Sequence, residues 1–167
     1  MCIRDSNKAH IALAELERDG VLTGIVTQNI DGLHQKAGNN KVYELHGSVM
    51  RNNCMDCGEY YDLDYIMDEN NCEKGIPRCK KCGGIVKPDV VLYEEPLNED
   101  VITGAVNVIA DADTLIVGGT SLVVYPAAGL INYFRGNDII LINKSETSYD
   151  SRATLIINDS IGKVLGE

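Results

Sequence analysis

The apolar positions of the chain alternate between helix-like and strand-like spacing along most of its length. Helical spacing over residues 7–19 predicts a first helix, which Ser6 or Asn7 could cap and Gly20 could end. Other stretches predict strands at 21–26, 42–45, 90–93, 114–117, 139–142 and 154–157, and helices at 31–37, 98–110, 126–134 and the C-terminus. Because apolar strands that alternate with helices are typical of a parallel sheet, the pattern predicts an α/β fold.

Residues 48–86 interrupt this pattern, since apolar periodicity fades there and cysteine, glycine, asparagine and charged residues accumulate. The stretch is interpreted as an inserted module. It holds two C-x2-C pairs, in which Gly58 and Gly83 follow the second cysteine and permit tight turns. Four thiolates can complete a closed tetrahedron around zinc, which leaves no position for a substrate. The predicted zinc ligands are Cys54, Cys57, Cys79 and Cys82, and the zinc is predicted to be structural.

Two disulfides or four free thiols are the alternative interpretation of the paired cysteines. The paired spacing and the lack of an N-terminal export pattern favour the metal site. Cys72 lies between the pairs and Cys2 lies in the first six residues, so neither is predicted to be a ligand.

Polar side chains gather where two of the apolar runs end. Gln28, Asn29 and Asp31 follow the run at 21–26, and His46 follows the run at 42–45. Ligands of open α/β sheets bind beside the carboxyl ends of strands, so these groups could meet in one crevice. The alternative is a polar turn with a structural histidine. His34 is interpreted as a surface or packing residue.

A second set of small polar residues follows two later strands. Gly118-Gly119-Thr120-Ser121 comes directly after the strand at 114–117, and Asn143 follows the strand at 139–142. Glycine lets a ligand approach the backbone, while hydroxyls and amides can bind ribose or phosphate oxygens. Such residues are common in turns, but their occurrence at successive strand ends favours a nucleotide site.

The charge and composition narrow the classes of partner. The 15 basic and 25 acidic residues give a net charge of -10, which argues against a nucleic-acid-binding protein. An acidic protein would more naturally meet a basic polypeptide. No apolar run approaches the length of a membrane span, so no membrane partner is expected. The N-terminus lacks a signal-peptide pattern, and cytoplasmic location is therefore expected.

Taken together, these motifs resemble the sirtuins, the NAD-dependent protein lysine deacylases. The resemblance extends from about Asn7 to the C-terminus. It rests on motifs in the same order as in that family, namely Thr27-Gln-Asn-Ile-Asp31, His46-Gly47, the paired cysteines, Gly119-Thr-Ser-Leu-Val-Val-Tyr-Pro-Ala127 and Leu141-Ile-Asn143. Each motif is weak alone, but their combination in this order is specific.

The resemblance implies a Rossmann-like parallel sheet with helices on both faces and a small inserted zinc-ribbon module. A Rossmann-type NAD-binding domain would comprise residues 7–47 and 87–167, and the zinc domain would comprise residues 48–86. The implied reaction transfers an acyl group from lysine of a protein or peptide to ADP-ribose of NAD and releases nicotinamide. The cofactors would be NAD, as co-substrate, and one structural zinc ion.

Site residues can be transferred from the family only onto matching positions. His46 would be the catalytic base, and Asn29 and Asp31 would assist beside the nicotinamide, near which Gln28 and Ile30 would also lie. The adenosine side of NAD would contact Gly119, Thr120, Ser121, Asn143, Lys144, Ser145, Ile161 and, less directly implied, Ser160. Val91 and Tyr93 would line the acyl-lysine, although Val91 could instead face the core of an edge strand.

The sequence departs from the family pattern in two places. Glu94 stands where the family commonly has glycine, so the family pattern does not determine the shape of the substrate entrance here. Before Asn7 there is no counterpart to the family's first βα unit with its glycine-rich phosphate turn, and residues 1–6 form a leader unlike the family. We therefore expect an N-terminally truncated chain that is inactive or weak, because preorganised phosphate binding would be lost.

Other functions are compatible with the same motifs. Within enzymes, the alternatives are mono-ADP-ribosyl transfer and a preference for longer or acidic acyl groups. In a different class, the chain could be a non-catalytic zinc-ribbon interaction module. The oligomeric state cannot be predicted from the sequence.

Overall fold

The computed structural model describes residues 5–166, which form two compact units. The first unit contains the chain up to Thr27, Leu33–Leu45 and the chain from Asn98 onward. The second unit contains Gln28–Gly32 and His46–Leu97. From the sequence we grouped residues 28–32, 46–47 and 87–97 with the Rossmann-type domain, whereas here they lie in the same unit as the paired cysteines.

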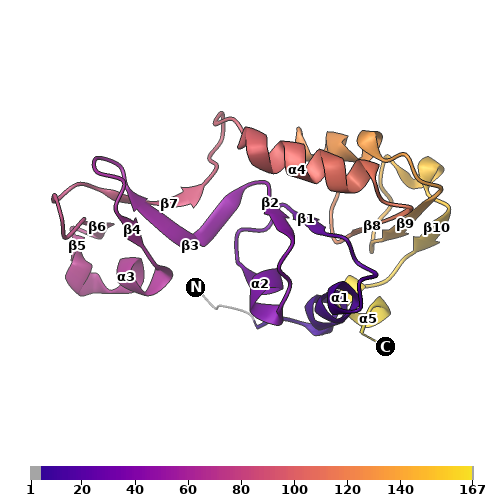
Figure 1. The fold of residues 1–167 in the computed structure, drawn as a ribbon, viewed down its shortest axis with the longest axis horizontal. Helices are drawn as coiled ribbons and strands as arrows, with labels where there is room; N and C mark the ends of the chain where they lie inside the picture. Colours follow the sequence, from indigo (N-terminus) through magenta and orange to yellow (C-terminus); the bar gives the residue numbers. More distant parts are fainter. Residues whose placement is uncertain (1–4, 167) are drawn as a thin grey trace. The chain divides into compact units, whose positions relative to one another are not determined.

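Parallel strands form the centre of the first unit. Strands β8 (Thr114–Gly118), β9 (Asp138–Ile142) and β10 (Leu155–Ile157) form a parallel sheet in the order β10-β9-β8. Strand β1 (Ile25–Thr27) pairs in parallel with β2 (Val42–Glu44). In Figure 1 these strands lie between α4 (Glu99–Ala110) on one side and α1 (Lys8–Arg18) with α5 (Ile161–Val164) on the other. The α/β organisation predicted from the apolar pattern is therefore confirmed.

Two helices of the first unit, α1 and α4, begin where the sequence predicts. The Asn7 side chain caps α1 by accepting from the backbone of Ala9 and His10, and Asn98 caps α4 in the same way. Between residues 5 and 166, no helix is long and apolar enough to cross a membrane. The remaining helical elements of this unit are α2 (Leu33–Ala37) and the 3-10 helices η2 (Ala127–Tyr133) and η3 (Asp150–Arg152).

An apolar cluster packs strands β8 and β9 against η2. Leu141 and Ala128 are almost completely buried within it, so the sheet and η2 share one core. The other buried members are Leu122, Ile131, Ile139 and Tyr149. The helix predicted at 126–134 is thus present as a 3-10 helix rather than an α-helix.

The second unit is built on an antiparallel sheet in the order β4-β3-β7. Its other elements are two short helices and a hairpin, and its small core contains Cys54, Cys79 and Val86 with Tyr61, Tyr65 and Ile66. The elements are β3 (Gly47–Cys54), β4 (Tyr60–Tyr61), α3 (Leu63–Met67), η1 (Glu69–Asn71), β5 (Cys72–Glu73), β6 (Ile76–Pro77) and β7 (Val86–Val90).

Two strand predictions were wrong in their bounds. The strand expected at 21–26 is the shorter β1, which begins at Ile25. The strand expected at 90–93 is instead β7, which ends at Val90. The polar residues around Pro88 concealed β7 in the apolar pattern. Proline is tolerated there because β7 is an edge strand, where one missing backbone N–H need not break the sheet.

One carboxylate fixes the loop between α2 and β2 to α1. The half-buried Glu17 accepts hydrogen bonds from Asn39 Nδ2 at 2.8 Å, from Asn40 N at 3.1 Å and from Lys41 N at 3.0 Å. Burial opposes ionisation of Glu17, but these bonds outweigh it and lower the pKa of the carboxyl group. The loop that leads into β2 therefore depends on a charged Glu17.

We expect Glu17→Gln to lower the free energy of unfolding by about 1–2 kcal/mol at pH 7, because charge-assisted hydrogen bonds are lost. A carboxyl group with a lowered folded-state pKa stabilises the protein above its unfolded pKa, and this contribution is lost as the pH falls through the folded pKa. The difference between variant and wild type should therefore shrink in acid, which denaturant titration at several pH values measures. Glu15→Gln, on the exposed side of α1, is the control; equal stability of Glu17→Gln and wild type at pH 7 would contradict the prediction.

Candidate functional site

The two C-x2-C pairs converge in the second unit. The four Sγ atoms lie within 4.8 Å of one another, with 3.4 Å between Cys54 and Cys82 and 3.6 Å between Cys57 and Cys79. A tetrahedron with zinc–sulfur distances of about 2.3 Å has sulfur–sulfur edges of about 3.8 Å, so the donor set fits zinc. The turns after each pair use Gly58 and Gly83 at φ values of +71° and +79°. The cysteines predicted as ligands are therefore positioned to bind a zinc ion.

The pKa values of the clustered cysteines also indicate that the cluster binds a cation. Burial opposes ionisation of Cys79, but hydrogen bonds from the Tyr61 hydroxyl and from the backbone of the Cys79 turn lower its pKa to about 6. For Cys82, the Gly84 backbone favours the thiolate, yet interactions with the neighbouring cysteines raise its pKa to about 12. One thiolate thus forms readily while the next is disfavoured by it. Four thiolates at this spacing need a bound cation to neutralise them.

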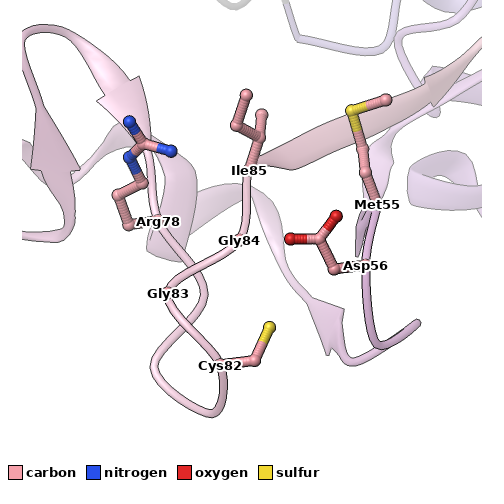
Figure 2. A pocket seen from close by; sticks show the side chains of 7 residues that line it. All are labelled: Met55, Asp56, Arg78, Cys82, Gly83, Gly84 and Ile85. Atoms are coloured by element: carbon pink, nitrogen blue, oxygen red, sulfur yellow. The ribbon is translucent and has the colours of Figure 1, made fainter.

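A shallow hollow of about 390 Å³ adjoins the cysteine cluster. Figure 2 shows the Asp56 side chain beside the Gly84 backbone and the Cys82 side chain at the tip of its loop. A Cβ atom on Gly84 would overlap the Asp56 carboxylate, so the two residues lie in close contact. The lining residues are Met55, Asp56, Arg78, Cys82, Gly83, Gly84 and Ile85. The hollow is thus formed by the two metal-binding turns themselves.

A hydrogen bond joins His46, which follows β2, to the segment 28–32, which follows β1. His46 Nδ1 lies 3.0 Å from the backbone oxygen of Gln28, and both residues belong to the second unit. A carbonyl oxygen only accepts, so Nδ1 carries the proton and Nε2 of the neutral ring is the acceptor. The Ile30 oxygen accepts from Val49 N at 3.0 Å. Segment 28–32 is therefore fastened next to an imidazole whose Nε2 can accept a proton.

The predicted adenosine-side residues gather at one edge of the first unit. Gly119 N donates to the Ile142 oxygen at 3.2 Å, and Asn143 N donates to the Ile157 oxygen at 3.1 Å. Asn143 Nδ2 donates to the backbone oxygens of Thr120 and Ser145, both at 3.0 Å. The loops after β8 and β9 are thus joined through Asn143. They form the carboxyl-end edge at which α/β sheets bind ligands.

The beginning of α5 belongs to the same edge. A Cβ atom on Gly118 would overlap Ile161 Cδ1, which shows that Ile161 packs closely against the end of β8. Ser160 is the residue that precedes α5. Ser121 and Lys144 are exposed at this edge. The structure therefore brings together the predicted residues of the loops after β8, β9 and β10.

The predicted substrate-side residues differ in their surroundings. Val91 is half-buried and its N–H donates to the His46 oxygen at 3.0 Å, whereas the Tyr93 side chain is fully exposed at 102%. Tyr93 lies in a turn closed by a 3.1 Å hydrogen bond from Glu95 N to the Leu92 oxygen. Glu94 occupies the third position of this turn with a φ of +71°. A positive φ at this position favours glycine, so Glu94 adopts a backbone conformation that is strained for a residue with a side chain.

The Leu92–Glu95 turn is held by the second glutamate. The Glu95 carboxylate accepts from Leu92 N at 2.8 Å and lies 3.5 Å from Lys87 Nζ. The hydrogen bond from Leu92, together with the positive charge of Lys87, lowers the pKa of Glu95 despite partial desolvation. Glu95 thus has a structural partner on each side, while the backbone at Glu94 carries the strain.

Two polar residues of the second unit, Tyr61 and Asn52, were not among the residues predicted from the sequence. Tyr61 lies with its hydroxyl 3.2 Å from Cys79 Sγ, and this bond raises the pKa of Tyr61 to about 12, so the hydroxyl stays neutral and donates. Asn52 is completely buried on β3. Alternation along β4 could have indicated that only one of Tyr60 and Tyr61 faces inward. No sequence signal distinguished Asn52 from its neighbour Asn53.

Comparison with known proteins identifies the family. The profile described as "Sir2 family" matches residues 3–126, which is more than half of the chain. This chain belongs to the Sir2 family. An "NAD-dependent protein deacetylase" of Clostridium perfringens is 67% identical over 162 residues, covering 96% of this chain and 65% of the relative. A protein of the same description from Cutibacterium acnes is 54% identical, covering 95% of this chain and 63% of the relative.

Solved structures of Sir2 proteins share the fold. One, "Sir2-p53 peptide-NAD+", has a TM-score of 0.88 at 36% identity and covers 96% of this chain and 68% of that chain. Another, "Structure of Sir2Tm bound to a propionylated peptide", has a TM-score of 0.87 at 38% identity and the same coverage. The Rossmann-like fold with an inserted cysteine module is thereby confirmed. The chain spans just under two thirds of the length of the curated relatives.

We expect the purified chain to contain one zinc per molecule, because its four Sγ atoms match a closed tetrahedral site. Removing zinc with a chelator should unfold the second unit, whose core includes Cys54 and Cys79. Metal analysis and circular dichroism measure the two effects. Cys79→Ser should lose zinc, while Cys72→Ser, outside the cluster, should retain it. A zinc-free chain that stays folded in chelator would refute the assignment.

At the strained turn, we expect Glu94→Gly to raise the free energy of unfolding by about 0.5–1 kcal/mol, because glycine adopts a positive φ without strain. Glu94→Ala removes the same carboxylate but keeps a Cβ atom, so it should give no such gain. Chemical denaturation of the three proteins makes the comparison. Equal effects of the two substitutions would show that charge, rather than backbone strain, governs stability here.

Proposed function

We propose that this protein is an NAD-dependent protein lysine deacylase that transfers the acyl group of an acylated lysine to ADP-ribose and releases nicotinamide. The observation that carries this proposal is the His46 ring, whose Nδ1 donates to the Gln28 backbone oxygen. That bond leaves Nε2 as a base directly beside segment 28–32. The names of the curated relatives support deacylation over mono-ADP-ribosyl transfer or a purely structural zinc module.

Each predicted group has one role in this reaction. Bound NAD would supply an electrophilic ribose carbon, with nicotinamide as the leaving group. His46 Nε2 would accept a proton from a ribose hydroxyl, since neutral imidazole is a suitable base near pH 7. Asn29 and Asp31 would hold the nicotinamide end, with Gln28 and Ile30 beside them. Val91 and Tyr93 would line the acyl-lysine.

The carboxyl-end edge of the first unit fits the adenosine side of NAD. Asn143 holds the loops after β8 and β9 together, so their backbone and hydroxyl groups can bind ribose and phosphate oxygens. Gly119 has a φ of +65°, and a Cβ atom there would meet nothing within 4 Å, so a ligand can approach its backbone. The proposed contacts are Gly119, Thr120, Ser121, Asn143, Lys144, Ser145 and Ile161, with Ser160 at the start of α5.

The proposed partners and location follow from the same groups. An acylated lysine in a protein or peptide would be the substrate, and solved Sir2 structures include complexes with an acetylated and a propionylated peptide. Zinc would have a structural role, because four cysteine ligands leave no position for substrate. We place the protein in the cytoplasm, since reduced thiols that hold zinc are typical of that compartment.

We expect His46→Phe to lower acyl-peptide-dependent nicotinamide release by at least about 100-fold, because the general base is removed. Single-turnover assays with labelled NAD and an acetylated peptide detect rates this low. Zinc content should not change, since the cysteines lie elsewhere in the unit. His34→Gln is the control histidine and should leave the rate unchanged. Undiminished release by His46→Phe would refute the proposed base.

The same assay tests the rate expected for the chain itself. The expectation stated for the sequence is a weak turnover, and it is compared with a relative of which this chain covers 65%. The Clostridium perfringens relative is the reference enzyme. Nicotinamide release at a comparable rate by the two proteins would contradict that expectation. ADP-ribose attached to the peptide, in place of acyl transfer, would indicate mono-ADP-ribosyl transfer.

A further inference from the structure

The regular pairing of β3 with β7 is interrupted shortly after His46, the residue that precedes β3. Its first residues pair regularly with β7, as Gly47 lies opposite Val90 and Ser48 opposite Asp89. The next pair along β7 is Asn52 with Pro88, so three residues of β3, 49–51, are extra. They form a bulge, a feature that often redirects a strand next to a functional site.

This bulge is the part of β3 that holds segment 28–32. Val49 N donates to the Ile30 oxygen at 3.0 Å. A Cβ atom on Gly32 would lie 2.9 Å from Met50 Cγ, so Met50 also packs against the segment. With the bond from His46 to the Gln28 oxygen, the segment is fastened at two alternate carbonyls. Asn29 lies between these two attachments and Asp31 follows the second.

Asn52 closes the bulge from inside the protein. Its side chain is completely buried, and its Nδ2 donates to the Val49 oxygen at 3.1 Å and to the Tyr61 oxygen at 3.3 Å. Ser48, which is 1% exposed, accepts from Met50 N through its hydroxyl at 3.2 Å. Both polar groups of the Val49 backbone are therefore engaged, one by Asn52 and one by Ile30.

A contribution to stability does not by itself account for Asn52 at this position. Among the described residues, Asn52 Oδ1 is buried without a hydrogen-bond partner, and such a group is unfavourable unless water reaches it. A buried asparagine that fixes a backbone bulge, at the expense of an unpaired oxygen, is better explained by what the bulge positions.

We propose that Asn52 is a positioning residue, which locks the β3 bulge and thereby sets Ile30 and Asp31 at a fixed distance from His46. The inference rests on the function proposed above for these residues. Asn52 itself touches no substrate. It acts through Val49, so its loss should loosen segment 28–32 and leave the His46 ring without a constant partner. Small displacements of this kind can lower a rate by about 100-fold.

The test combines ring NMR with kinetics on the zinc-loaded full chain. The chain has three histidines, so nitrogen-15 labelling resolves each ring, and a His46→Gln spectrum assigns the relevant signals. Wild-type His46 should show the Nδ1–H tautomer. Asn52→Leu, of similar volume, should retain zinc yet show averaged tautomers and a kcat lowered about 10- to 100-fold. Asn53→Ala, at the exposed neighbouring position, should match the wild type.

Each outcome decides the proposal. A zinc-loaded Asn52→Leu with an unchanged His46 tautomer overturns it. If that variant does not fold, Ser48→Ala perturbs the same bulge and should give the same spectral change. If both variants lose zinc or unfold, Asn52 acts through stability and the proposal is wrong. Absence of acyl-dependent nicotinamide release in the wild type would instead refute the proposed function, and the tautomer measurement would remain valid.

Discussion

The close approach of Gly47 to Asp89 is the constraint on which the second unit depends. Gly47 has a φ of +75°, and a Cβ atom there would overlap the Asp89 backbone oxygen. Only glycine lets the chain turn from His46 into β3 while β7 lies this close. The same approach aligns Val91 N with the His46 oxygen. In the His46-Gly47 pair, the backbone conformation of the glycine therefore determines the position of the histidine.

Strand β3 connects the proposed base to the cysteine cluster within that unit. It begins next to the imidazole and ends at Cys54, the first of the four clustered cysteines. Tyr61 lies on the neighbouring β4, where its hydroxyl donates to Cys79 and its backbone oxygen accepts from Asn52. Strand β3 thus connects the proposed base to the metal centre, although their separate sequence motifs gave no sign of the connection.

The features predicted successfully from the sequence are local ones. Asn7 and Asn98 mark helix starts because capping depends on the next three residues, and the C-x2-C pairs indicate zinc because two turns supply the whole donor set. The features that were missed depend on partners distant in sequence. Strand β7 was obscured by Pro88, and Asn52 owes its importance to Val49, Tyr61 and the register of β3. The strain at Glu94 became visible only with its backbone angle.

The division of the chain has a mechanical consequence for the proposed base. Gln28–Gly32 and His46 belong to one compact unit, together with β3 and the four cysteines. Any displacement of that unit as a rigid body leaves the 3.0 Å separation of His46 Nδ1 and the Gln28 oxygen unchanged. The tautomer of His46 is consequently fixed by contacts within one unit. Its Nε2 is therefore available as an acceptor without any contact from the other unit.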